Sequence, residues 1–215
     1  MKTFIFGASG FAKEVEFYIF ESNNYQQTDL DIYAFVVHDS EYHVGNSING
    51  IQIISENQYF NVFHKSEIHN CVIAVGHPTL KEKIYNKINC DATLFPTIIH
   101  PSVIYDKRTV KVGKGSIICP GNLITTEIEI GDFVHLNINT TVGHECEIGN
   151  FSTISPGVQI SGNVRISTNV FIGTGAAILE NVEITANSII GASALVNKTI
   201  KESGTYVGMP VKKIK

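Results

Sequence analysis

A six-residue repeat of branched aliphatic residues spans Val112 to Val196 and constrains the fold more than any other feature of the chain. A period of six fits neither the 3.6-residue turn of an amphipathic helix nor the two-residue alternation of a strand. It indicates an array of stacked structural units. The repeating residues are Val112, Ile118, Ile124, Ile130, Leu136, Val142, Ile148, Ile154, Ile160, Ile166, Ile172, Ile178, Ile184, Ile190 and Val196.

The residue two positions before each aliphatic is usually small or β-branched, so both positions are expected to face inward on one short strand. Three six-residue units then make a triangular coil, and successive coils stack as parallel strands about 4.8 Å apart. The repeat therefore predicts a parallel β-helix with a continuous aliphatic interior. The small or β-branched inward residues are Ser116, Thr140, Cys146, Ser152, Val158, Val164, Ala176, Ser188 and Ala194.

A glycine or serine often follows the repeating aliphatic directly, at the corner of the predicted coil. Glycine adopts backbone conformations that other residues avoid, so we expect unusual dihedral angles at these positions. Corner side chains point away from the packed interior and are available for chemistry. The corner residues are Gly113, Gly131, Gly143, Gly149, Ser155, Ser161, Gly173 and Gly191.

The first 95 residues are expected to form a small parallel α/β unit of the Rossmann-like type, because apolar strands alternate with helical patterns. The unit is too short for a full dinucleotide-binding fold, so a mononucleotide is the more natural ligand. In the last helix Leu80, Ile84 and Ile88 are expected to be buried, with its lysines outside. Strands are expected at 2–6, 32–37, 48–54 and 71–75, and helices after Gly10 and over 78–88.

Two places in this unit are candidate ligand contacts. Ser9 and Gly10 lie between the first strand and the first helix, where backbone N–H groups of a helix start bind phosphate. Asp39 follows the second strand, where an acidic residue contacts a ribose or base in Rossmann-like units. The turn is shorter than the dinucleotide fingerprint. A plain strand-to-helix turn at Ser9 and a plain loop start at Asp39 remain open alternatives.

Charge and composition exclude several classes of protein. The chain has 16 basic and 20 acidic residues, for a net charge of −4, which argues against nucleic acid or an anionic membrane as a partner. No stretch reaches the apolar length of a membrane span, and the N-terminus lacks a signal-peptide cleavage pattern. The 4 cysteines show no C-x-x-C pair, so neither a disulfide framework nor a zinc knuckle is indicated. We expect a cytoplasmic protein.

Among the 8 histidines, His144 has the setting that best suits chemistry. It lies at a corner, two residues after the inward Val142, and Glu145 follows it. Histidine transfers protons near neutral pH, and a neighbouring carboxylate orients the ring; a solvated corner pair is the alternative. The other histidines are expected to be structural or solvated, with His38, His43, His64, His69 and His77 in loops or exposed positions of the first unit and His100 and His135 in or near the repeat.

A metal site is the competing interpretation of this corner. A zinc hydratase on such coils would need three convergent histidines, and only His135 and His144 lie in the coils proper. Cys146 is expected to point inward while His144 points outward, so the two do not ligate one ion together. We therefore expect no metal.

Four segments together resemble the PglD/NeuD-type sugar acetyltransferases, whose hexapeptide repeats form left-handed β-helices. The resemblance implies a Rossmann-like nucleotide-sugar-binding domain at 1–95, a left-handed β-helix acetyltransferase domain at 96–200 and a C-terminal tail at 201–215. It also implies a homotrimer with sites between subunits, which transfers acetyl from acetyl-CoA to the amine of a nucleotide-linked amino-dideoxy sugar. The segments are GASGFAKE, VGHPTLKEKI, GHECEIGNFSTISPGVQISGNVRI and YVGMPVKKIK.

The resemblance also implies roles for individual residues. His144 matches the general base and Glu145 its partner, and Asn137 matches a polar residue of the same site. Two positions depart from the family, because Phe11 and Thr153 stand where a histidine is usual. The substrate-binding positions are Ser9, Gly10, Phe11, Asp39 and Asn137, and the positions that contact acetyl-CoA are Gly162, Thr174 and Ala192.

These residues leave two other functions open. O-acetylation of a sialic acid or a free sugar needs the same base, so the coils do not distinguish it from N-acetylation. A non-catalytic scaffold that binds a nucleotide sugar would keep the β-helix for assembly alone. The nucleotide base and the sugar are not defined by these residues.

Overall fold

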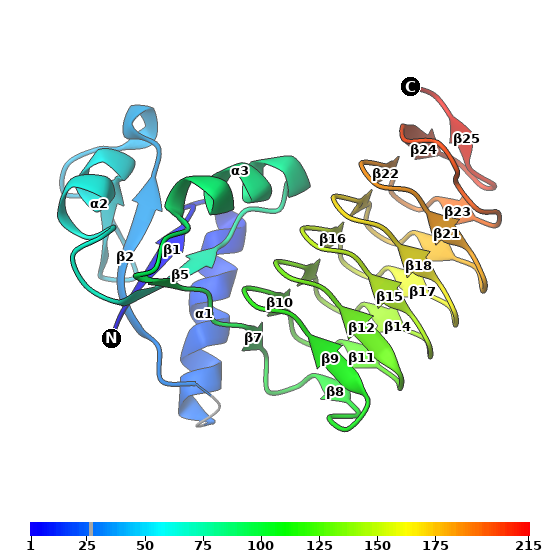
Figure 1. The fold of residues 1–215 in the computed structure, drawn as a ribbon, viewed down its shortest axis with the longest axis horizontal. Helices are drawn as coiled ribbons and strands as arrows, with labels where there is room; N and C mark the ends of the chain where they lie inside the picture. The colour runs from blue at the N-terminus through cyan, green and yellow to red at the C-terminus, as the bar shows by residue number, and fades with distance from the viewer. Residues whose placement is uncertain (26–27) are drawn as a thin grey trace. The chain divides into compact units, whose positions relative to one another are not determined.

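The structure is a computed structural model that describes residues 1–25 and 28–215 (Figure 1). The chain divides into two units, one comprising Met1–Gly76 and Leu80–Pro96, and the other His77–Thr79 and Thr97–Lys215. No helix in the described ranges is long and apolar enough to cross a bilayer.

The N-terminal unit contains a six-stranded sheet in the order β3-β4-β2-β1-β5-β6. β1 lies in the middle and pairs in parallel with both β2 and β5, and only β3 pairs in the antiparallel sense among these described strands. The elements of this unit are β1 (Lys2–Phe6), α1 (Gly10–Asn24), β2 (Asp31–Val37), the 3-10 helix η1 (Asp39–Glu41), β3 (Ser47–Ile48), β4 (Ile51–Ser55), α2 (Glu56–Val62), β5 (His69–Ile73), β6 (Thr93–Leu94) and α3 (Pro78–Ile88), whose first two residues are counted with the second unit.

The predicted α/β organisation is confirmed, with one helix that the sequence analysis missed. α2 begins after Ser55, whose hydroxyl accepts from the Gln58 amide while the Gln58 side chain accepts from the Ser55 amide. This reciprocal capping box has a recognisable S-x-x-Q pattern, so the helix start was visible in the sequence. The predicted strand over 48–54 is two strands, β3 and β4, joined by a tight turn.

The buried side of α3 differs from the prediction. Leu80 is 48% exposed, whereas Lys81 is fully buried and Ile88 is buried as expected. Burial lowers the pKa of the Lys81 ammonium well below its usual value. Apolar spacing therefore located the helix and the burial of Ile88, but at the start of the helix Lys81 is covered in place of Leu80. Packing against other segments, and not the local pattern, decides which of these two side chains is covered.

The second unit is a parallel β-helix of three sheets, which confirms the predicted left-handed fold class. Each coil contributes one two- or three-residue strand to each sheet, and the registers pair residues eighteen apart, such as Leu136 with Ile154. The strands below are grouped by sheet, and we call the groups sheets 1, 2 and 3.

Sheet 1 contains β7 (Ile98–Ile99), β10 (Ile117–Ile118), β13 (His135–Leu136), β16 (Thr153–Ile154), β19 (Phe171–Ile172), β22 (Ile189–Ile190), β24 (Thr205–Val207) and β25 (Lys212–Lys213). Sheet 2 contains β8 (Ile104–Tyr105), β11 (Leu123–Ile124), β14 (Thr141–Val142), β17 (Gln159–Ile160), β20 (Ala177–Ile178) and β23 (Leu195–Val196). Sheet 3 contains β9 (Val110–Val112), β12 (Ile128–Ile130), β15 (Glu147–Ile148), β18 (Arg165–Ile166) and β21 (Glu183–Ile184).

The repeating aliphatics fill the interior as predicted. All of them from Ile118 to Val196 are buried, and Val112 in the first coil is half-buried. The small inward residues are buried as well. Ser116 and Ser152 use their hydroxyls inside the coil, each donating to a carbonyl of the next coil, so these polar groups cost little to bury.

The unusual backbone angles do not occur where we expected them. The glycines directly after the aliphatics are not left-handed; the positive φ values fall two residues later, at every corner. Nine of these left-handed positions are Gly or Asn, which tolerate the conformation best, and that second repeat was visible in the sequence. The positions are Gly115, Gly121, Glu127, Phe133, Asn139, Glu145, Phe151, Gly157, Asn163, Asn169, Gly175, Asn181, Asn187 and Ser193.

The glycines directly after the aliphatics are needed instead for close stacking of coils. A Cβ on Gly149 would lie 2.6 Å from the carbonyl carbon of Ser167, and one on Gly143 would lie 2.7 Å from the amide nitrogen of Gly162. Backbone atoms of the next coil cannot move aside without breaking the ladder. At Gly143 and Gly149 the close approach of the next coil therefore leaves no room for a Cβ, although the equivalent positions Ser155 and Ser161 carry side chains.

We predict that Gly149→Ala destabilises the β-helix, because its methyl group meets backbone of the next coil. Overpacking of this kind costs about 1–3 kcal/mol, measurable as a lower urea midpoint in equilibrium unfolding. Ser155→Ala is the control, since Ser155 occupies the equivalent position with a side chain already present. Equal stabilities of the Gly149 variant and the parent would contradict this explanation.

Candidate functional site

The corner between sheets 2 and 3 carries the histidine selected from the sequence. His144 and Glu145 lie between β14 and β15, and their side chains are 54% and 59% exposed. Cys146, the next residue, faces the interior and is buried, so the predicted inward and outward directions are confirmed. The two exposed side chains contact each other, with 2.9 Å between Nδ1 of His144 and Oε2 of Glu145.

This contact determines which ring nitrogen of His144 is available. An ionised carboxylate only accepts hydrogen bonds, so Nδ1 of His144 carries a hydrogen and donates a hydrogen bond to Glu145. In the neutral ring Nε2 then has the lone pair. The arrangement therefore presents a proton acceptor at an exposed corner, oriented by a carboxylate, which is the pairing that general-base catalysis needs.

The backbone of Glu145, which positions its carboxylate beside His144, is in the left-handed conformation. Its φ is 59°, and its amide donates to the carbonyl of Thr126 in the preceding coil. Glu127, at the equivalent position of that coil, has a φ of 57°. The conformation therefore belongs to the coil, and the contact with His144 is what distinguishes Glu145.

Gly162 lies next to His144, one coil further along. A Cβ at Gly162 would be 2.5 Å from Cε1 and 2.6 Å from Nε2 of the imidazole. The Asn163 amide donates to the His144 carbonyl over 2.8 Å. Of the three predicted acetyl-CoA positions, Gly162 is the one that the chain itself brings to the histidine.

The remaining predicted positions of the coils lie at the corner between sheets 1 and 2. Asn137 is half-buried and its Oδ1 accepts from the Ile138 amide over 2.8 Å, whereas Thr174 and Ala192 are exposed. Sheet 2 separates this corner from that of His144. A single chain therefore holds two groups of predicted site residues on the two edges of one sheet.

Thr153, one of the two positions where a histidine is usual in the family, is buried in β16 of sheet 1.

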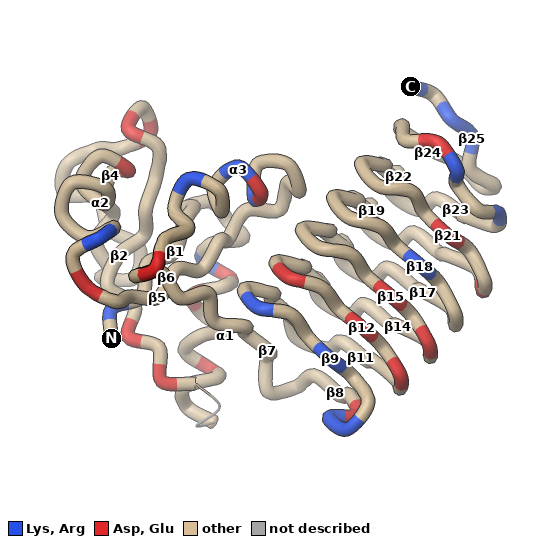
Figure 2. Tube along the Cα trace, in the orientation of Figure 1, with Lys and Arg blue, Asp and Glu red and all other residues tan. Residues whose placement is uncertain are grey.

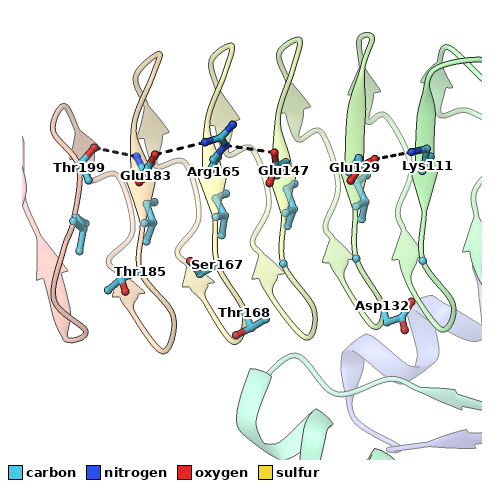
Figure 3. Close-up of a pocket in the computed structure, with 18 of the residues that line it drawn as sticks. Lys111, Glu129, Asp132, Glu147, Arg165, Ser167, Thr168, Glu183, Thr185 and Thr199 are labelled. Carbon is cyan, nitrogen blue, oxygen red and sulfur yellow. Dashed lines mark hydrogen bonds and ion pairs between the residues drawn. The ribbon is translucent and has the colours of Figure 1, made fainter.

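A broad hollow lies over the outer face of sheet 3 and contains none of the predicted site residues (Figure 3). It is crossed by ion pairs between successive coils: Lys111 with Glu129 at 2.6 Å, and Arg165 with Glu147 at 3.4 Å and Glu183 at 3.8 Å. These side chains are exposed, and such pairs contribute little to stability. The chemistry of the corner at His144 makes it the stronger candidate site.

In the N-terminal unit, the predicted phosphate turn has the expected local geometry. α1 begins at Gly10 with Ser9 as its N-cap, and the Ser9 side chain makes no capping hydrogen bond within the described residues. The first amide groups of a helix lack intrahelical partners. The turn follows β1, whose neighbours β2 and β5 lie on opposite sides, and ligands of open α/β sheets bind at such a switch point. Phe11 is half-buried in the first turn.

Gly7 makes this turn possible. Its φ is +113°, and a Cβ there would lie 2.9 Å from the carbonyl oxygen of Ala74. Only glycine satisfies both conditions without a shift of the backbone.

Asp39 follows the end of β2, as predicted; it is separated from Val37 by His38, begins η1 and is exposed. One of its oxygens accepts from the Asn57 amide over 3.2 Å, in the first turn of α2. Partial desolvation would raise the pKa of the Asp39 carboxyl, but hydrogen bonds from Ser55 and Asn57 outweigh it and hold that pKa below its usual value. The Asp39 carboxylate is therefore an ionised hydrogen-bond acceptor. One of its oxygens already accepts from the Asn57 amide and so helps to join η1 to α2.

One histidine prediction is wrong. His69 is fully buried in β5, and not in a loop or exposed, because the strand begins two residues earlier than expected. Its Nε2 lies 2.7 Å from the Tyr59 hydroxyl and its Nδ1 2.8 Å from the Glu67 carbonyl.

Within residues 1–25 and 28–215, no three His, Cys, Asp or Glu side chains gather as a metal site would require.

Comparison with known proteins gives a family match within the first 88 residues, one curated relative over part of the chain, and solved structures that match nearly all of it. The profile of the PglD N-terminal domain matches residues 2–88. A GDP-perosamine N-acetyltransferase of Escherichia coli O157:H7 is 33% identical over 143 residues. That match covers 66% of this chain and 62% of the relative, so the chain spans less than two thirds of the relative's length.

Several solved structures share the whole fold. WeeI from Acinetobacter baumannii AYE is 28% identical with a TM-score of 0.85, covering 100% of both chains. The acetyltransferase domain of PglB from Neisseria gonorrhoeae FA1090, in complex with acetyl coenzyme A, is 25% identical with a TM-score of 0.84, covering 99% of this chain and 98% of that one. PerB from Caulobacter crescentus, in complex with CoA and GDP-perosamine, is 24% identical with a TM-score of 0.87, covering 100% and 98%.

We predict that Glu145→Gly separates stability from chemistry. Glycine relieves the left-handed backbone, so the free energy of unfolding is unchanged or raised by up to about 1 kcal/mol. The variant also loses the carboxylate that orients His144, so any reaction that uses Nε2 of His144 as a base should slow at least tenfold. Glu127→Gly is the matched control, with the same backbone relief and unchanged turnover. Full activity in Glu145→Gly would remove the orienting role.

Proposed function

Because residues 2–88 are a PglD N-terminal domain and the resemblance to PglD-type sugar acetyltransferases is confirmed, we propose that this protein transfers acetyl from acetyl-CoA to the amine of a nucleotide-linked amino-dideoxy sugar. The observation that carries the proposal is the His144–Glu145 pair, whose 2.9 Å contact leaves Nε2 as a proton acceptor. The names of the E. coli relative and of the CoA-bound neighbours support the same reaction.

In the proposed reaction the sugar amine attacks the thioester carbonyl, while Nε2 of His144 removes a proton from the nitrogen. The carbon–nitrogen bond forms, the carbon–sulfur bond breaks, and the CoA thiolate leaves and takes up a proton from the imidazolium. Glu145 stabilises the imidazolium between these two transfers. General-base assistance contributes roughly 10²–10⁴-fold, and the positioning of two bound substrates contributes much of the rest.

The N-terminal domain, 1–95, is proposed to hold the nucleotide sugar. The amides at Ser9 and Gly10 would bind phosphate, and Asp39 would accept from a ribose or base. Phe11, in the first turn of α1, would supply an apolar contact where a histidine is usual. The β-helix, 96–200, would carry the chemistry, and the tail, 201–215, contributes β24 and β25 at the last coil.

The two separated corners of sheet 2 support a homotrimer. If the edge with His144 and Gly162 in one copy meets the edge with Asn137, Thr174 and Ala192 in the next, both groups line one site. Head-to-tail contacts close into a ring when the rotation between copies is a whole fraction of a turn, and the resemblance implies a ring of three.

The outer face of sheet 2 suits this contact, because it is uncharged. Its outward residues are Ile104, Leu123, Thr141, Gln159, Ala177 and Leu195. Ile104 and Leu123 are 68% and 43% exposed in the single chain. Sheet 3, by contrast, carries charged residues along β9, β12, β15, β18 and β21 (Figure 2).

We also propose a cytoplasmic location, where acetyl-CoA and nucleotide sugars are present.

We predict that His144→Ala lowers turnover at least a hundredfold, because it removes the proton acceptor. Steady-state assays of CoA release would measure it, and light scattering should give the mass of a trimer for the variant and its parent. His43→Ala, an exposed histidine outside the proposed site, is the control. Near-parental turnover in His144→Ala would overturn the assignment of the base.

A panel of acceptors tests the substrate class. GDP-perosamine, the sugar in the name of the E. coli relative, should be acetylated, alongside UDP- and dTDP-linked 4-amino-4,6-dideoxy sugars and a sialic acid as competitors. Mass spectrometry of the product would show one added acetyl group on nitrogen. Acetylation of the sialic acid alone would favour the O-acetyltransferase alternative. No product and no thermal shift with acetyl-CoA would favour a non-catalytic scaffold.

A further inference from the structure

Gly162 has no conformational reason of its own to be glycine. Its φ is not left-handed, and the equivalent corner positions of other coils in the same column carry side chains: Thr126, His144, Glu180 and Lys198. The geometry of the coil therefore accepts a Cβ at this corner position. The need for glycine at 162 must come from something particular to this coil and its neighbour.

The particular feature is the imidazole of His144. The three atoms closest to a Cβ on Gly162 all belong to that ring: Cε1 at 2.5 Å, Nε2 at 2.6 Å and Cδ2 at 3.1 Å. At Gly143 and Gly149, by contrast, the closest atoms belong to the backbone of the next coil. Gly162 thus differs from the stacking glycines, because it makes room for one side chain.

The backbones on either side of this contact are fixed. The Asn163 amide donates to the His144 carbonyl over 2.8 Å, and the Gly143 amide donates to the Ile160 carbonyl over 2.8 Å. The two corners therefore stay one coil spacing apart whatever residue stands at 162. A methyl group at 162 would have to displace the ring, and the ring would leave the Glu145 carboxylate.

We propose that Gly162 is a positioning residue for His144: its missing Cβ lets the imidazole lie against the next coil, with Nδ1 held by Glu145 and Nε2 left for the acceptor amine. This role rests on the proposed acetyl transfer and adds to it a residue that acts through the base. It differs from a contact to the pantetheine arm, which would act on the binding of acetyl-CoA.

The kinetic test is Gly162→Ala. Displacement of the ring lowers kcat at least tenfold, with KM for acetyl-CoA and for the nucleotide sugar within about twofold of the parent. A pure acetyl-CoA contact predicts the opposite, a raised KM with kcat preserved. That second result, or parental values of both constants, would overturn the positioning role.

A stability cycle tests the same contact without any assay of activity. Gly162→Ala should lower Tm slightly in the parent, because the exposed ring has to move aside, and should not lower it in a His144→Ala background, where the three closest atoms are gone. Gly149→Ala is the control, because its Cβ meets backbone and its loss in Tm should be the same in both backgrounds. An equal loss for Gly162→Ala in both backgrounds would overturn the proposal.

The two tests separate this inference from the proposed function. If His144→Ala keeps full turnover, the assignment of the base fails, while the cycle still reports whether Gly162 and the ring are in contact. If the base is confirmed and the cycle shows no coupling, the positioning role alone fails.

Discussion

The spacing between coils is the constraint on which the rest of the second unit depends. Parallel strands stack about 4.8 Å apart, and every coil repeats the one before it eighteen residues later. This repetition buries the aliphatic column and saturates the backbone amides. It also leaves so little room at the corners that a single methyl group at Gly149 would touch the next coil.

The same constraint shapes the candidate site. Because each corner backbone is tied to the coils before and after it, the side chains of a corner have few ways to adjust. His144 lies at a corner where its own neighbour in sequence, Glu145, and its neighbour in the next coil, Gly162, limit it from two directions. The repetitive scaffold thereby limits the orientations open to this exposed imidazole, which suits the proposed role as a general base.

Left-handed corners show how the fold distributes its conformational cost. Asn and Gly occupy most of them and adopt the conformation at little cost, whereas Glu127, Glu145 and the stacked pair Phe133–Phe151 do so at a higher one. Burial of the aliphatic interior offsets the conformational free energy that these positions cost. At Glu145 the side chain at such a corner contacts the proposed base.

The sequence alone determined the period, the inward residues and the identity of the corner histidine, because a six-residue repeat of aliphatics has one way to bury its side chains. It also indicated the α/β character of the first unit and the places of Ser9 and Asp39 at strand ends. These features depend on the local pattern of residues and on which apolar residues must be buried. Both can be read from the order of residues in the chain.

Only the tertiary structure decided features that depend on atoms far apart in the sequence. The burial of Lys81 and His69, the role of the glycines between coils, and the contact of Gly162 with His144 all arise from packing against another segment. The separation of Asn137 from His144 by sheet 2 follows from which strand belongs to which sheet. The six-residue period predicts which side chains face the interior. The stacking of coils in three dimensions decides which outward-facing residues come into contact.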